Sequence, residues 1–148
     1  MKAALSAALV LLLAACSEST GPAGNLRVQT DRSVYSLPGG PGIPSVPVEF
    51  TVKNTSSFPV VLPNCGAGVL PELQRRQGGI WVDVGYQACP SFAVYAPLVL
   101  APGETASGQT TLAEPGVYRI RVAAAQEEGG DFSSYSISPI FEAHGLEL

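Results

Sequence analysis

Apolar and polar residues alternate in several short runs of this sequence, and the alternation limits the folds that the chain can adopt. In VPVEFTVKN, at 46–54, three valines and a phenylalanine fall on one side, and charged or hydroxyl residues fall on the other. YRIRVA, at 118–123, alternates in the same way, and LRVQT, at 26–30, reads as a first strand. A period of two residues is typical of a strand with one buried face. These segments therefore predict strands rather than helices.

Turn residues separate the runs at regular intervals. LPGGPG, NTSS, QGG, APGE, AEPG and EEGGD stand between the alternating segments, and the chain has 16 glycines and 13 prolines in 148 residues. Short strands at this spacing favour an antiparallel β-sandwich. We expect one all-β sandwich domain at 26–148.

The last alternating run lies near the carboxyl terminus. SYSISPIF, at 134–141, places aromatic and aliphatic residues on one side and serines on the other. The pattern predicts that Tyr135, Ile137 and Phe141 face the core together.

One hairpin can be predicted in detail. Gly78-Gly79 lies at the centre of PELQRRQGGIWVDVG and suits a two-residue turn with positive φ at both positions. Symmetric pairing sets Arg76 opposite Trp81 on the outer face, where the two side chains can form a cation–π pair. The remaining expected pairs are Arg75 with Val82, Gln74 with Asp83 and Leu73 with Val84; Ile80, Val82 and Val84 are expected to face the core.

The amino-terminal segment has the pattern expected of a sorting signal. One positive charge at Lys2 precedes a nearly continuous apolar run at 3–15, which is too short to span a bilayer as a helix. Leu13-Ala14-Ala15-Cys16 resembles a bacterial lipobox. The resemblance implies that residues 1–15 are a cleaved lipoprotein signal peptide and that Cys16 is lipidated. Residues 16–25 then form a polar, lipidated tether.

The lipobox also predicts the location of the protein in the cell. We expect an exported protein that the lipid on Cys16 anchors to the cell membrane. Ser17, rather than an acidic residue, follows the anchor. In a two-membrane bacterium this is similar to lipoproteins that are sorted to the outer membrane, where this chain would face the periplasm.

Cys65 and Cys89 remain once the lipidated cysteine is set aside. An even pair in an oxidising compartment favours a structural disulfide. A metal site is the rival interpretation, but His144 is the only histidine and no Cys-x-x-Cys occurs. A redox-active pair lacks the same motif.

A segment near 114–120 resembles the entry to strand F of immunoglobulin-like domains. Tyr118 stands two residues before the core position Ile120, as the tyrosine of a tyrosine corner does. The resemblance implies an immunoglobulin-like sandwich. More broadly, residues 46–124 resemble the intracellular proteinase inhibitor family, through an Asn-Thr-Ser strand end, a Pro-Gly-Glu turn and a Pro-Gly-x-Tyr strand. This resemblance implies proteinase inhibition as one possible activity.

Catalytic and metal-binding groups are sparse. His144 lies in the tail, where a solvated role is expected, and Glu127, Glu128 and Asp131 form an acidic cluster without the spacing of a calcium loop. The net charge of −4 and the scattered basic residues argue against nucleic-acid binding. We expect no enzyme activity, no cofactor and no metal.

Two surfaces remain as candidates for binding a partner. The first is Trp81 with Arg76, because Trp and Arg are enriched at interface hot spots. The second is CPSFAVYAP, at 89–97, through Phe92 and Tyr95; packing within the domain is the alternative at both places. We expect a non-catalytic, membrane-anchored module that binds a protein or envelope partner. The alternatives are a proteinase inhibitor and an accessory lipoprotein of a secretion or assembly machine.

Overall fold

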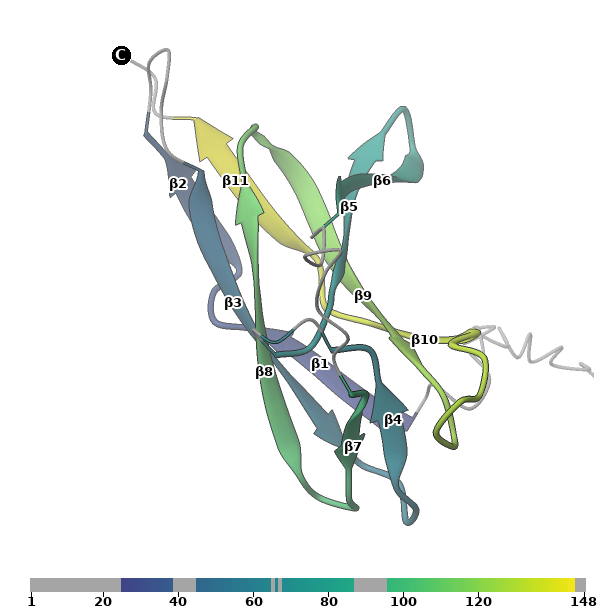
Figure 1. Cartoon of the computed structure of the whole chain (residues 1–148). Helices are drawn as coiled ribbons and strands as arrows, with labels where there is room; N and C mark the ends of the chain where they lie inside the picture. The colour runs from purple at the N-terminus through teal and green to yellow at the C-terminus, as the bar shows by residue number, and fades with distance from the viewer. Residues whose placement is uncertain (1–24, 39–44, 65, 67, 87–95, 146–148) are drawn as a thin grey trace, which may run out of the picture.

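The computed structural model describes residues 25–38, 45–64, 66, 68–86 and 96–145, and these form a β-structure (Figure 1). Within these ranges no helix is long and apolar enough to cross a membrane. The strands are β1 (Leu26–Thr30), β2 (Val34–Leu37), β3 (Val46–Asn54), β4 (Val60–Leu62), β5 (Glu72–Gln77), β6 (Ile80–Tyr86), β7 (Leu98–Leu100), β8 (Thr105–Leu112), β9 (Gly116–Ala124), β10 (Ser134–Ile137) and β11 (Phe141–Gly145).

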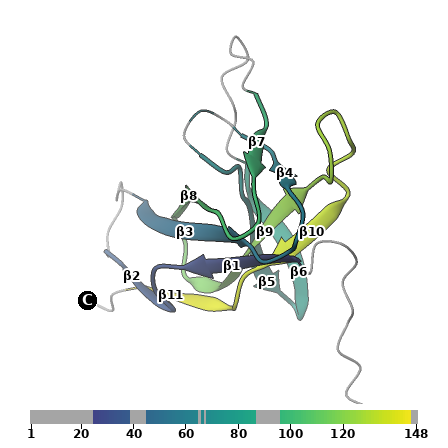
Figure 2. The same cartoon turned by 90° about the horizontal axis from the view of Figure 1, so that it is seen from below.

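Two larger sheets make the sandwich. The first has the order β1-β3-β8, and the second has the order β2-β11-β9-β5-β6, with β10 also pairing with β9. A small third sheet joins β4 and β7 (Figure 2). In Figure 1, β3 and β8 lie toward the left of the molecule and β9 and β5 toward the right. The expected all-β sandwich is confirmed.

The strand order is that of an immunoglobulin-like sandwich. The first strand pairs with β3 in one sheet, and the chain then crosses so that β2 runs parallel to β11 in the other. The remaining neighbours within the two larger sheets are antiparallel. In the immunoglobulin scheme β1, β3 and β8 correspond to strands A, B and E. In the second sheet β11, β9, β5 and β6 correspond to strands G, F, C and C′.

The core lies between the two larger sheets and follows the predicted alternation. In β3, Val48, Phe50 and Val52 are buried, and in β9, Tyr118, Ile120 and Val122 are buried. Their polar neighbours along each strand point to the outer faces. Burial of these alternating apolar side chains is the main force that joins the sheets.

The predicted tyrosine corner is present. The Tyr118 hydroxyl donates to the backbone oxygen of Glu114 at 2.7 Å. This bond ties the start of β9 to the turn before it, as the corner does in immunoglobulin-like domains.

The prediction for 134–141 is wrong for two of its three residues. Phe141 is buried, but Tyr135 is half-buried and Ile137 is 40% exposed. The reason is a bulge, because the three residues 138–140 face only two residues of β9 between the pairs Ile137–Arg121 and Phe141–Tyr118. One extra residue moves every side chain before it to the opposite face.

Ser138 holds this bulge in place. Its N–H donates to the Ile120 oxygen at 2.9 Å, and its Oγ accepts from the Ile120 N–H at 2.9 Å. The serine side chain therefore supplies the acceptor that a regular strand would offer from its backbone.

The hairpin turn and most of its register are confirmed. Gly78 and Gly79 have φ values of 56° and 89°. The pairs Arg76–Trp81, Arg75–Val82 and Gln74–Asp83 form as predicted. The fourth prediction is wrong, since a bulge pairs Leu73 with Gly85 instead of Val84.

The expected burial of the hairpin's apolar face is wrong. Ile80 is 65% exposed, Val84 is 40% exposed and Val82 is half-buried. The first sheet ends at β8, so no further strand of that sheet among the described residues covers the β5–β6 hairpin. The alternation therefore identified the correct face, but that face extends beyond the sandwich.

The buried phenol of Tyr35 leads us to expect that the folded protein loses stability in alkali. Burial, followed by its hydrogen bond to the Asp31 carboxylate, raises the pKa of the Tyr35 phenol from 10.0 to about 12. Because the folded-state pKa is raised, this contribution to stability is complete below pH 10 and is lost as the pH rises toward 12. We expect the free energy of unfolding to fall over that interval, and Tyr35→Phe to make the fall smaller. Denaturant unfolding of both proteins between pH 9 and pH 12 is the measurement; an equal fall in both would contradict the assignment.

Candidate functional site

The outer face of the second sheet gathers charged and aromatic side chains. Because Tyr118, Ile120 and Val122 of β9 point into the core, Arg119 and Arg121 point outward. The neighbouring strands contribute alternate residues to the same face in the same way. This surface, here called the outer face, comprises Glu72, Gln74 and Arg76 of β5, Trp81 and Asp83 of β6, Arg119 and Arg121 of β9, and Tyr135 of β10.

Gln74 lies at the centre of the outer face and is only 4% exposed. Its Oε1 accepts from Arg119 Nε at 2.8 Å, and its Nε2 donates to Asp83 Oδ1 at 2.7 Å. The guanidinium of Arg119 then lies 4.3 Å from the centre of the Trp81 ring. The hydrogen bond fixes the orientation of Arg119, so the cation–π contact holds the indole in a defined position.

Arg121 forms a second stack on the same surface. Its Nε donates to Glu72 Oε2 at 2.5 Å, and its Nη2 lies 3.6 Å from Asp83 Oδ2. Its guanidinium lies 4.4 Å from the centre of the Tyr135 ring. Arg119 and Arg121 of β9 thus each stack on one aromatic ring. Glu72 and Asp83 partly neutralise the positive charge of this surface.

The predicted Arg76–Trp81 stack is replaced by an Arg119–Trp81 stack. Arg76 is opposite Trp81 in the ladder, as expected, but it is exposed, and the cation over the indole comes from β9, two strands away. Arg119 occupies this position because Gln74 anchors it. The alternation of YRIRVA is enough to place Arg119 and Arg121 on the outward side of β9. The sequence does not show that β9 pairs with β5, and this pairing is what brings Arg119 close to Trp81.

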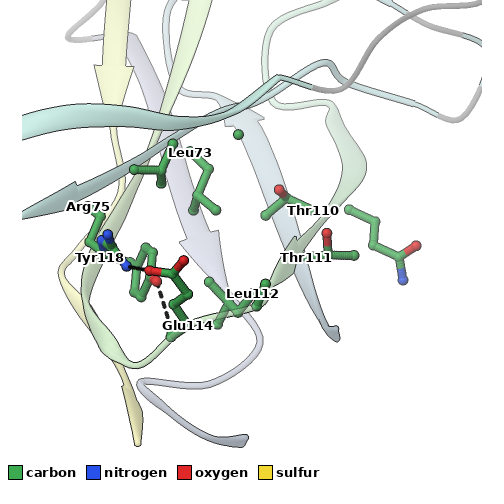
Figure 3. A pocket seen from close by; sticks show the side chains of 11 residues that line it. Leu73, Arg75, Thr110, Thr111, Leu112, Glu114 and Tyr118 are labelled. Atoms are coloured by element: carbon green, nitrogen blue, oxygen red, sulfur yellow. Dashed lines mark hydrogen bonds and ion pairs between the residues drawn. The ribbon is translucent and has the colours of Figure 1, made fainter. Parts of the chain in front are cut away.

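A groove lies on the opposite face of the same hairpin (Figure 3). It runs between β8 and the inner face of the β5–β6 hairpin and has a volume of about 530 Å³. Its lining is a mixture of apolar, hydroxyl and paired charged residues: Leu73, Arg75, Val84, Gly85, Gln109, Thr110, Thr111, Leu112, Ala113, Glu114 and Tyr118.

The charged end of the groove is an ion pair. Arg75 Nη1 contacts Glu114 Oε2, beside the tyrosine corner. Its hydrogen bond to Glu114 raises the pKa of the Arg75 guanidinium, and burial raises the pKa of the Tyr118 phenol. The opposite charges of Arg75 and Glu114 compensate each other in this ion pair, which leaves the groove without net charge.

The remaining candidates for chemistry lie apart from these surfaces. His144 Nε2 is 3.0 Å from Glu142 Oε2, and both side chains are at least half exposed. Glu127, Glu128 and Asp131 occupy the exposed turn between β9 and β10. No group of three or more His, Cys, Asp or Glu side chains among the described residues is placed to hold a metal ion.

Several predicted site residues lie outside the described residues. They are the lipidation residue Cys16, the proposed disulfide pair Cys65 and Cys89, and the aromatic residues Phe92 and Tyr95.

Comparisons with known proteins do not identify a family. A scan against protein-family models and a search of curated proteins match nothing. Among solved structures, the chain is similar to a β-glucosidase from Listeria innocua, at 16% identity and a TM-score of 0.35 over 81% of this chain and 16% of the enzyme. Two ligand complexes of the same enzyme, with glucose and, for a D270A mutant, with laminaribiose, match at 17% identity and a TM-score of 0.34 over 83% of this chain.

Proposed function

We propose that the protein is a membrane-anchored, non-catalytic immunoglobulin-like module that binds a protein or envelope partner through its outer face. The observation that carries this proposal is the Trp81 indole, half-buried and held by Arg119 on a sheet face of paired charges. Trp and Arg supply a large share of binding energy at interfaces, and a side chain that is ordered before binding loses less entropy on binding.

The charge arrangement supports the same surface. Arg121 is neutralised by Glu72 and Asp83, and Gln74 joins Asp83 to Arg119. A partner that covers this surface therefore meets Arg121, Glu72 and Asp83 already paired with one another, which lowers the cost of burying these charges.

Truncation of Trp81 should remove most of the binding. We expect Trp81→Ala to weaken recovery of the partner from native membranes by about tenfold or more, because a central hot-spot tryptophan contributes about 2 kcal/mol or more. Ile80→Ala is the matched control, since Ile80 precedes Trp81 and faces the opposite side of the hairpin. Quantitative pull-down with the three proteins is the measurement. Equal recovery with both variants would contradict a role for the outer face.

The anchor is tested independently of the surface. We expect Cys16→Ser to abolish partition into the detergent phase, because the serine hydroxyl cannot accept the thioether-linked lipid and a protein without acyl chains is not held to a bilayer. If the variant is processed and still partitions with detergent like the wild type, the proposed anchor on Cys16 is wrong.

A further inference from the structure

Part of the outer edge of β8 carries backbone hydrogen-bonding groups that no described strand covers. The Glu49 oxygen accepts from Asp31 N–H at 2.9 Å, so the backbone groups of Glu49 point away from β8. Gln109 is paired with Glu49 in the β3–β8 ladder. In an antiparallel ladder this places the Gln109 N–H and C=O on the outer edge of β8, away from β3.

A second contact indicates the same orientation of the β8 backbone. The Ser107 oxygen accepts from the Val69 N–H at 3.0 Å, on the side of β8 away from β3. Alternation then places Ser107, Gln109 and Thr111 on the outer edge. Val69 lies along this edge at Ser107 and Gly108, where its backbone oxygen is close to Gly108. Alongside Gln109 and Thr111, the part of the chain that the structure describes contributes no further strand.

The sequence of β8 does not protect this edge. Natural edge strands are usually blunted by charged residues, proline or a bulge. The TASGQTTL segment of β8 contains no charged residue and no proline, and its pairing with β3 is regular from Thr105 to Leu112. The edge strand β6, by contrast, carries Asp83 and a bulge.

The groove beside this edge restricts the chemistry of a bound strand. Leu73, Val84 and Leu112 line it, and Arg75 and Glu114 neutralise each other at its end (Figure 3). A strand added to β8 would direct alternate side chains toward this lining. A charged side chain there would find no unpaired countercharge among the described lining residues, whereas an apolar one would contact Leu73 and Val84.

We propose that the edge of β8 at Gln109 and Thr111, which no described strand covers, together with this groove, binds an extended, uncharged peptide segment of a partner protein by strand addition. The backbone groups of Gln109 and Thr111 hydrogen-bond the peptide, and the groove selects apolar side chains at alternate positions. This site is on the opposite side of the β5–β6 hairpin from Trp81, so it is independent of the outer face.

The first test is amide exchange in dilute full-length protein. The Gln109 and Thr111 amides should exchange about tenfold faster, or more, than those of Gly108 and Thr110, which point toward β3. Equal protection at all four amides would mean that the chain covers its own edge and would overturn the proposal. Protection of Gln109 and Thr111 that grows with protein concentration would also overturn it, in favour of a second copy.

The second test is selection of peptides from a random nonapeptide library on the full-length protein. Selected peptides should alternate apolar residues around an uncharged centre and should slow exchange at Gln109 and Thr111. Thr111→Pro removes the outward N–H without removing a bond to β3, so it should abolish binding, whereas Thr111→Val should retain it. Failure to select such peptides, or binding that Thr111→Pro leaves intact, would overturn the proposal.

Two further variants keep this test decisive. Val84→Lys adds a charge to the groove at a 40% exposed position without altering the edge; it should also abolish binding, even if Thr111→Pro does not fold. Trp81→Ala should leave peptide binding unchanged, which separates this site from the outer face. Binding that survives Val84→Lys or is lost with Trp81→Ala would contradict the assigned site.

Discussion

Phe141→Ala should lower the free energy of unfolding by about 3–5 kcal/mol, which is the range for truncating a fully buried phenylalanine. Phe141 is 1% exposed and lies between two tyrosines. Its ring centre is 5.6 Å from that of Tyr35, edge to face, and 5.9 Å from that of Tyr118, stacked. The substitution therefore leaves a cavity and removes both aromatic contacts from the second sheet.

The adjacent residue provides the control. Ile140 is 53% exposed, so Ile140→Ala should change stability by less than about 0.5 kcal/mol. Denaturant unfolding of the wild type and both variants, with equal slopes, is the measurement. A similar, small loss in both variants would show that the Tyr35–Phe141–Tyr118 cluster is not part of the stabilising core.

Asn54→Leu should lower the free energy of unfolding by about 2–4 kcal/mol, although leucine is apolar and close in size. Asn54 is completely buried. Its Nδ2 donates to the backbone oxygens of Phe58 at 2.8 Å and Leu100 at 2.9 Å, and its Oδ1 accepts from Ser56 N–H at 2.9 Å. The side chain thus joins the end of β3, the following turn and β7, and leucine would remove all three of these hydrogen bonds at a completely buried position.

Ser57→Ala is the control for Asn54, since Ser57 is exposed in the same turn. Thermal or denaturant unfolding gives the loss of stability, and exchange of the Ser56 amide reports the turn itself. If Asn54→Leu is as stable as Ser57→Ala, the hydrogen bonds of Asn54 do not hold this turn, and the Asn-Thr-Ser strand end has another role.

The sequence alone predicts several of the strands and the hairpin turn because local periodicity and turn chemistry determine them. The alternation at 46–54 and 118–123 matches buried and exposed positions in β3 and β9, and Gly78-Gly79 adopts the expected turn. These features depend on neighbours within a few residues, so they can be read without knowing the tertiary structure.

The sequence could not predict features that depend on distant strands. The bulge opposite Ile120 reverses Tyr135 and Ile137, and only pairing with β9 reveals the extra residue. The exposure of Ile80 follows because β8 is the last described strand of the first sheet, which local alternation does not report. The cation–π partner of Trp81 also depends on a distant strand. The hairpin pattern predicts Arg76 from the adjacent strand, whereas Arg119 of β9 lies over the indole.

Photo-crosslinking in intact cells tests most directly whether the outer face binds a partner. A benzophenone amino acid replaces either Arg76, exposed on the outer face, or Lys53, exposed on β3 of the other sheet. Both positions are exposed, so the two proteins differ mainly in which sheet carries the crosslinker. We predict a discrete adduct from position 76 that Trp81→Ala abolishes, and none from position 53. Adducts from position 53 alone, or equally from both, would contradict the assignment of the binding surface.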